Sequence, residues 1–233
     1  MSGTITAIET QARHGNRFNL YLDDRFAMGL SAPLAATLHV GQHLSDEELT
    51  AMERREALEA AHEKALRFLE ARPRSTAEVK QHLLKKQVAP DVVEQEVARL
   101  AEVGLVDDQA FAKFWVENRE EFRPRAAYAL RFELKRKGLP DDAIREAIGS
   151  LDESESAYRA GLARARRWRE LDHREFRDKM GGFLMRRGFS YETARHAVER
   201  LWQAAQDESA LSQSESALSQ DESALSQDEK DPS

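Results

Sequence analysis

The sequence predicts a mainly α-helical protein of three tandem three-helix repeats, with a small β-rich N-terminal module and a disordered acidic C-terminal tail. Three observations predict this architecture. Apolar and polar residues alternate near the N-terminus, which is the period of a half-buried strand. A pattern of leucine, paired cations and a turn residue recurs three times at offsets of about 50 residues. The C-terminal residues repeat a polar seven-residue motif.

Composition excludes several classes of protein. The chain has 233 residues, of which 41% are hydrophobic and 33% charged, and it contains no cysteine. It therefore has no disulfide framework and no thiolate metal site. The first residues lack the basic start and apolar run of a signal peptide, and no run approaches the roughly 18 apolar residues of a membrane span. We expect a cytoplasmic protein with no membrane association.

The net charge of −7 is concentrated at one end of the chain. Residues 205–233 contain eight acids and one base, so they account for the whole −7, and the remainder balances at 34 bases and 34 acids. Three successive heptads each end in Glu-Ser-Ala-Leu-Ser-Gln. Their apolar residues, Ala and Leu, are adjacent and do not have the a and d spacing of a coiled coil. One leucine per heptad buries too little surface to offset the entropy of ordering, which predicts a disordered tail over residues 205–233.

Residues 1–44 are expected to form the β-rich module. Strands are predicted at about 5–11, 17–22 and 25–29, with turns at His14-Gly-Asn16 and Asp23-Asp24. A short helical turn is predicted after Ser31-Ala-Pro33. His39 and His43 have a spacing that can bind a metal on a helix, but Gly41 lies between them and no third ligand is near. We interpret them as surface or partly buried histidines and expect no metal.

Residues 45–107 are predicted to hold a connector and the first three-helix repeat. Ser45 and Glu48 form a capping box at the start of a helix that runs to about residue 71. Its charged early half is interpreted as a solvated connector and its late half as the first core helix. Helices over 57–71, 75–87 and 90–103 form the repeat, with a second capping box at Ser75 and Glu78 and Pro90 in a first turn.

Residues 108–151 and 152–204 are predicted to hold the second and third repeats. The expected helices are 108–121, 124–137 and 140–150, then 154–170, 173–187 and 190–204, with Pro124 and Pro140 as openers and Gly138 and Gly188 as stops. The junction before the second repeat has Gly104 just past a helix and Asp107 as the next N-cap. The aromatic residues near helical spacing are expected to pack in the cores, with base stacking as the lesser alternative for one of them: Phe111, Phe114, Trp115, Trp168 and Trp202.

No enzyme motif is found in the sequence. It has no Gly-rich phosphate loop, no nucleophile elbow and no zinc-ligand cluster, so neither catalysis nor a cofactor is expected. The carboxylate pairs Asp107-Asp108 and Asp141-Asp142 lie at predicted helix starts, where capping and dipole compensation explain them.

Basic residues give the stronger functional signal. A cation doublet recurs in register just before the turn of each repeat, at Lys85-Lys86, Arg136-Lys137 and Arg186-Arg187. Any one of these is explained by a solvated charged face, but their repetition indicates a joint role toward phosphates or an acidic protein surface. The predicted contact residues are Lys85, Lys86, Arg123, Arg125, Lys135, Arg136, Lys137, Arg186 and Arg187.

Several motifs resemble the RecX family of bacterial RecA regulators. They are Arg74-Ser-Thr-Ala-Glu-Val-Lys-Gln-His-Leu83, Gly104-Leu-Val-Asp-Asp-Gln-Ala-Phe-Ala112 with Trp115-Val116, and Arg123-Pro-Arg with Glu133-Leu-Lys-Arg-Lys-Gly-Leu139. The resemblance covers about residues 57–203, and the strand-rich start is similar to the N-terminal extension of longer members. Departures are Gln87 at the usual glycine of the first turn, Ala126 after the Arg-Pro-Arg, a loosely matching third repeat and the tail.

The resemblance implies a non-enzymatic modulator with an elongated, curved body of three-helix repeats. Such a protein binds in the groove of the RecA–single-stranded DNA filament and limits filament growth, strand exchange and the ATPase and coprotease activities, with a part in recombination, DNA repair and the SOS response. We expect a monomer whose partner is this filament, with weaker binding to single- or double-stranded DNA. The alternative, from a different class, is a protein that binds nucleic acid directly through its basic edges without regard to sequence.

Overall fold

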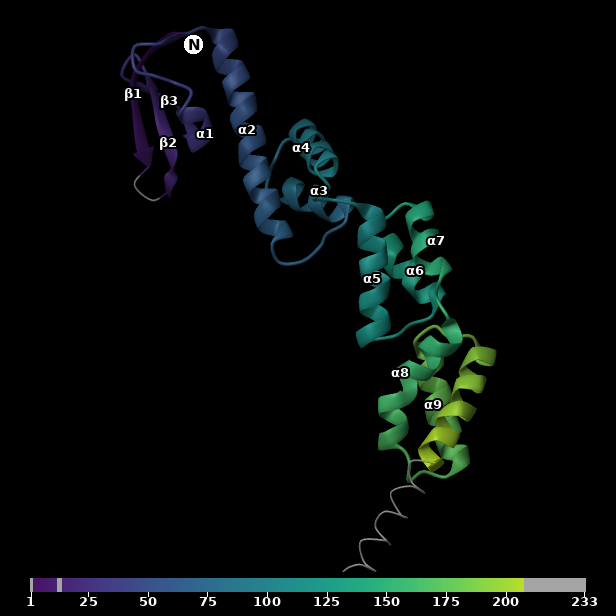
Figure 1. The fold of residues 1–233 in the computed structure, drawn as a ribbon. Coiled ribbons are helices and arrows are strands. Elements are labelled where there is room, and N and C mark those ends of the chain that lie inside the picture. The colour runs from purple at the N-terminus through teal and green to yellow at the C-terminus, as the bar shows by residue number, and fades with distance from the viewer. Residues whose placement is uncertain (1, 12–13, 208–233) are drawn as a thin grey trace, which may run out of the picture. The chain divides into compact units, whose positions relative to one another are not determined.

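A computed structural model of the protein describes residues 2–11 and 14–207, so the predicted disordered tail lies almost wholly outside the described residues (Figure 1). Ten helices lie within these ranges. The chain divides into two compact units at Phe111 and Ala112. The first unit contains the sheet, the first three-helix repeat and residues 108–111, and the second unit contains the rest of the second repeat and the third repeat.

A four-stranded sheet forms the N-terminal module. Strands β1 (Gly3–Gln11), β2 (His14–Leu22) and β3 (Arg25–Ser31) form an antiparallel meander, and β4 (His43–Leu44) pairs with β1, so the order is β3-β2-β1-β4. The three predicted strands and the turn at Asp23-Asp24 are confirmed. The predicted turn at His14-Gly-Asn16 is wrong, because β2 already begins at His14. The sequence also gave no signal for the two-residue β4.

The predicted helical turn after Pro33 is confirmed as α1 (Ala32–Ala35), and α2 (Asp46–Leu69) follows β4. The capping box of Ser45 and Glu48 is confirmed: Ser45 Oγ accepts from Glu48 N, and the Glu48 carboxylate accepts from Ser45 N. The first half of α2 is not the solvated connector that the sequence predicted. Leu49 is buried in the core of the sheet, and the buried Glu56 carboxylate accepts from Ser31 N at 2.6 Å and pairs with Arg17 at 2.8 Å. These contacts attach α2 to the module.

The first three-helix repeat is completed by α3 (Thr76–Lys85) and α4 (Pro90–Glu102), which pack on the second half of α2. The capping box at Ser75 and the position of Pro90 in the first turn of α4 are confirmed. The core of this repeat contains Ala65, Val79, Leu83, Val93, Val97, Leu100 and Val106.

The second repeat consists of α5 (Asp108–Phe122), α6 (Ala127–Arg136) and α7 (Asp141–Gly149). The third consists of α8 (Glu153–Arg167), α9 (His173–Arg186) and a helix over 191–207. The two prolines are not the predicted first helical residues, since Pro140 is the N-cap of α7 and Pro124 precedes the N-cap of α6. Gly104, Gly138 and Gly188 all have positive φ, which confirms them as helix stops.

Acids at the start of one repeat cap a helix of the repeat before it. Asp108 Oδ1 accepts from Thr76 N at 2.9 Å, at the start of α3, and Glu153 Oε1 accepts from Ala127 N at 2.7 Å, at the start of α6. The N-cap of α6 is Ala126, which has no side-chain acceptor, so Glu153 supplies the missing cap. Each successive repeat therefore satisfies a polar group of its predecessor.

Gln87 provides a test of the turn geometry. It occupies the turn position of Gly138 and Gly188 and has a φ of 59°, which is unfavourable for a residue with a Cβ atom. Replacement of Gln87 by glycine should raise the free energy of unfolding by about 0.5–1 kcal/mol, measured by urea or thermal denaturation. The reciprocal control is Gly104→Gln, at a φ of 72° with open space around it, which should lose about 1 kcal/mol. Lower stability of the Gln87→Gly variant would contradict this reasoning.

Candidate basic contact surface

Each cation doublet lies at the C-terminus of the second helix of its repeat. Lys85, Arg136 and Arg186 are the last residues of α3, α6 and α9, and the residue after each is the C-cap. Cations at this end interact favourably with the helix dipole and the unsatisfied carbonyl groups. Part of the repetition therefore has a structural explanation.

The second members of the later doublets are also held by aromatic rings. Lys137 Nζ lies 4.1 Å from the centroid of Trp115, whose ring also contacts the guanidinium of Arg119 at 4.3 Å. In the third repeat, Arg187 lies 4.8 Å and Arg164 4.3 Å from the centroid of Phe183. Both Lys137 and Arg187 are only partly exposed. These two cations stabilise their repeats as well as contributing charge.

The first members are the accessible ones. Lys85, Arg136 and Arg186 are exposed, as is Lys86, and none forms an ion pair with a carboxylate among the residues the structure describes. Lys135 differs, because its Nζ pairs with Asp141 Oδ1 at 2.6 Å, and this hydrogen bond lowers the pKa of the Asp141 carboxyl. The predicted set thus contains free cations and compensated ones.

Four arginines of the second unit, Arg123, Arg125, Arg164 and Arg187, form what we call the arginine cluster. Arg187 Nη1 donates to Pro124 O at 3.0 Å, and Arg187 O accepts from Ala126 N at 3.3 Å, so the end of α9 packs at the start of α6. Burial lowers the pKa of the Arg187 guanidinium, and the charges of Arg125, Arg164 and Arg123 lower it further. The fold therefore gathers three predicted contact residues, and adds Arg164.

Glu133 is the carboxylate that offsets part of this charge. Its Oε2 accepts from Trp115 Nε1 and Arg119 Nε, both at 2.8 Å, and its Oε1 pairs with Arg125 Nη1 at 2.9 Å. No described carboxylate pairs with Arg123 or Arg164. The surface around the arginine cluster is therefore strongly positive and suited to an anionic partner.

The carboxylate pairs have the expected roles at helix starts. Asp107 Oδ1 accepts from Gln109 N and Ala110 N at 2.8 and 3.0 Å, which confirms it as the N-cap of α5. Asp141 and Asp142 lie in the first turn of α7. Of the aromatic residues expected in the cores, Phe111 is buried, Trp115, Trp168 and Trp202 are partly buried, and Phe114 is exposed.

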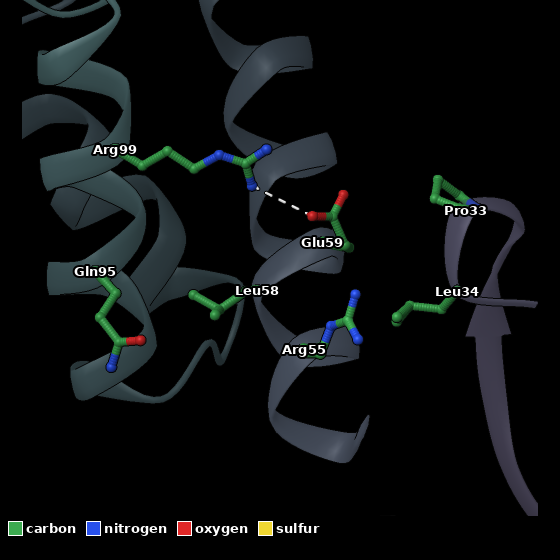
Figure 2. Close-up of a pocket in the computed structure, with 7 residues that line it drawn as sticks. All are labelled: Pro33, Leu34, Arg55, Leu58, Glu59, Gln95 and Arg99. Atoms are coloured by element: carbon green, nitrogen blue, oxygen red, sulfur yellow. Dashed lines mark hydrogen bonds and ion pairs between the residues drawn. The ribbon is translucent and has the colours of Figure 1, made fainter. Parts of the chain in front are cut away.

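A cavity of about 420 Å³ lies in the first unit, and none of its lining residues is a predicted contact residue (Figure 2). Figure 2 shows α1, α2 and α4 around it, with Arg99 Nη1 paired to Glu59 Oε1 at 3.3 Å. This pair leaves Arg55 as the remaining cation of the lining, which consists of Pro33, Leu34, Arg55, Leu58, Glu59, Gln95 and Arg99. Glu59 is the single carboxylate among these lining residues.

Within the described ranges, no three His, Cys, Asp or Glu side chains gather as a metal site, and His39 and His43 are both exposed. A separate search of the same ranges finds no helix with the length and apolar character needed to cross a bilayer.

His82 packs on an aromatic ring close to three cations in the first repeat. Its ring stacks on Phe68 at a centroid distance of 4.0 Å, and the Arg74 guanidinium lies 4.0 Å from the same Phe68 centroid. Burial lowers the pKa of His82 below its usual 6.5, and the charges of Lys86, Arg74 and Lys85 lower it further. The folded protein therefore favours the neutral ring.

The unfolded chain binds a proton at His82 more readily than the folded chain, so stability should fall as pH drops below about 6.5 and should be unaffected by this group above it. Replacement of His82 by glutamine should flatten this part of the profile, measured as the difference in melting temperature between wild type and variant from pH 8 to about 5. Parallel profiles for the two proteins would contradict the assignment.

The fold and surface define a class: a modular protein of three-helix repeats with basic helix ends and no catalytic motif in its sequence. Four family profiles match the chain. They are described as the regulatory protein RecX N-terminal domain, at residues 3–44, and the first, second and third three-helix domains of RecX, at 61–100, 107–148 and 152–198. The chain belongs to the RecX family of regulatory proteins.

Curated relatives agree with this assignment. Regulatory protein RecX of Bacillus subtilis is 30% identical over 202 residues, which cover 84% of this chain and 76% of the relative. The protein of the same name in Leuconostoc citreum is 30% identical over 203 residues, covering 85% and 76%.

Solved structures show the same fold. A crystal structure of regulatory protein RecX matches 84% of this chain and 99% of its own with a TM-score of 0.64 and 23% identity. The structure of RecX from Lactobacillus salivarius matches 63% and 97% with a TM-score of 0.55 and 19% identity.

Proposed function

We propose that this chain is a non-enzymatic regulator of the RecA recombinase. It binds in the groove of the RecA–single-stranded DNA filament as a monomer in the cytoplasm and limits filament growth, strand exchange and the ATPase and coprotease activities. Its membership of the RecX family supports the assignment to a regulator. The five domains proposed are those expected from sequence, with boundaries after residues 44, 107, 151 and 204.

The recurrence of exposed cations at equivalent helix ends carries the proposal. Arg136 ends α6, whereas the backbone of Arg187 contacts the N-cap of the same helix. The two doublets of the second unit therefore lie about one helix length apart, roughly 15 Å for the ten residues of α6. Contacts repeated along one protein add through effective concentration, which suits a polymer that presents the same anionic groups at intervals.

Reversing the two accessible doublet cations of the second unit tests this. The Arg136→Glu/Arg186→Glu variant should need about tenfold more protein for half-inhibition of the RecA ATPase on single-stranded DNA. Both positions are exposed and unpaired within the described residues, so circular dichroism should show unchanged helicity. Lys137 is left intact because it packs on Trp115.

A matched control reverses two exposed arginines on the third helices of the same repeats. The Arg145→Glu/Arg195→Glu variant has the same change in net charge and should retain inhibition within about twofold. Equal loss in both variants would show that only net charge matters and would refute the doublet assignment. If the wild-type protein leaves the RecA ATPase unchanged, the proposed function itself fails.

A further inference from the structure

Two aromatic side chains lie on the solvent side of α6. Tyr128 is 77% exposed and Phe132 is 59% exposed, and they are four residues apart, so their rings lie on neighbouring turns of one helix face. The opposite side of α6 carries the fully buried Leu130 and Leu134. Large aromatic residues exposed together in this way indicate an interaction surface.

The other repeats show that the fold does not require these rings. At the offset of 51 residues, the equivalents of Tyr128 and Phe132 in α3 are Ala77 and Gln81. At the offset of 50 residues, the equivalents in α9 are Asp178 and Gly182. The helices α3, α6 and α9 have the same place in their repeats, and of these three only α6 carries the aromatic pair.

The same face is basic. Helical spacing places three cations beside the rings, and we call the five residues together the α6 outer face: Tyr128, Arg131, Phe132, Lys135 and Arg136. Asp141 compensates Lys135, while Arg131 and Arg136 form no ion pair with any described carboxylate. The one acid of α6, Glu133, is mostly buried and binds Trp115, Arg119 and Arg125. The face thus combines aromatic rings with two uncompensated guanidinium groups.

We propose that the α6 outer face binds single-stranded nucleic acid by stacking Tyr128 and Phe132 on unpaired bases, while Arg131 and Arg136 contact the phosphates. This inference rests on the proposed function, because the strand that the face would bind is the single-stranded DNA within the RecA filament. Aromatic rings with cations are the usual platform for unpaired strands, since every base has a π face. A helix that docks in a hydrophobic protein groove carries apolar anchors at i, i+3, i+4 and i+7, whereas positions i+3 and i+7 from Tyr128 are the cations Arg131 and Lys135.

The test measures binding of the full-length protein, without RecA, to three fluorescently labelled probes of equal length. The probes are a thymidine strand, the same strand with abasic sites in place of its bases, and a duplex. The wild-type protein should bind the thymidine strand about tenfold tighter than the abasic strand or the duplex. The Tyr128→Ala/Phe132→Ala variant should bind the thymidine and abasic strands equally, at an unchanged salt slope.

Two further variants separate stacking from charge and from general effects. Arg131→Gln/Arg136→Gln should weaken binding to every probe. On the single strands it should reduce the slope of log K against log salt by about 1.4, at about 0.7 per phosphate contact. Tyr191→Ala removes a tyrosine that is 72% exposed at the start of the last described helix, and it should bind like wild type.

Equal binding of the wild-type protein to the thymidine and abasic strands, or no binding to either, would overturn the stacking inference. So would an alanine variant that loses inhibition of RecA while its strand binding is unchanged, since the face would then dock on protein. Base-dependent binding by a wild-type protein that does not affect the RecA ATPase would instead refute the proposed function and leave this inference standing.

Discussion

Replacement of Gly161 by valine is expected to lower the free energy of unfolding of the third repeat by about 3 kcal/mol. Gly161 lies in the buried face of α8. A Cβ atom at this position would overlap Leu201 Cδ1 and approach Met180 Sδ to 3.2 Å. Leu201 and Met180 are both fully buried, so neither can move away without disturbing the core. The close approach of α8 to the last helix therefore depends on the absence of a side chain.

Differential scanning calorimetry and urea denaturation would measure this loss. The matched control is Gly181→Val in α9, where a Cβ atom meets nothing within 4 Å. Valine has a slightly higher helix propensity than glycine, so this control should keep or slightly raise stability. Similar stability of the two variants would show that the third repeat repacks freely around Gly161.

The second large effect is expected at Glu133. Replacement by alanine should destabilise the second unit by about 2–3 kcal/mol, because Trp115 Nε1 loses its acceptor while Arg119 and Arg125 lose their carboxylate beside other arginines. The effect should shrink at high salt, where repulsion among the arginine cluster is screened. Glutamine at the same position keeps an acceptor for Trp115, so Glu133→Gln should lower the stability less than Glu133→Ala does.

The control for Glu133 is Glu146, whose carboxylate pairs with Lys113 at 2.8 Å on the surface, with both side chains about half exposed. Exposed pairs contribute about 0–1 kcal/mol, so Glu146→Ala should be nearly neutral in the same denaturation experiment. If both substitutions cost the same, Glu133 stabilises the fold no more than an exposed ion pair does, and the expected effect of its contacts with Trp115, Arg119 and Arg125 is wrong.

Local signals allowed most of the helices to be predicted from sequence. Ser45, Ser75 and Asp107 cap helices where expected, and Gly104 and Gly138 end them, because capping and positive φ are properties of a few adjacent residues. Prediction failed where contacts between residues far apart in the sequence determine whether a segment is buried. The first half of α2 is charged and looks solvated, yet the sheet holds it through Glu56, whose partners Ser31 and Arg17 are remote in sequence.

In the candidate site, too, the local features could be predicted from the sequence and the long-range contacts could not. The register of the doublets could be read from the repeats, but the packing of Lys137 and Arg187 on aromatic rings could not. Nor could the gathering of Arg123, Arg125 and Arg164 around Arg187. Tyr128 and Phe132 were missed, although alignment of the repeats contained the signal. Rings at positions that are small or polar in the sister repeats are not needed for a core.

The capping of one repeat by the next has a consequence for how the array can be cut or extended. Because Glu153 supplies the acceptor for Ala127 N, a truncation before residue 152 would leave α6 with an unsatisfied amide, and its first turn should fray. In contrast, α9 (His173–Arg186) has its own N-cap residue, Asp172, whose Oδ1 accepts from Glu175 N. The third repeat needs no outside cap at this position, but its Arg187 donates to Pro124 O and its Ser156 Oγ donates to Glu120 of the second repeat. Each of the last two repeats therefore satisfies polar groups of the other, and the two should fold cooperatively.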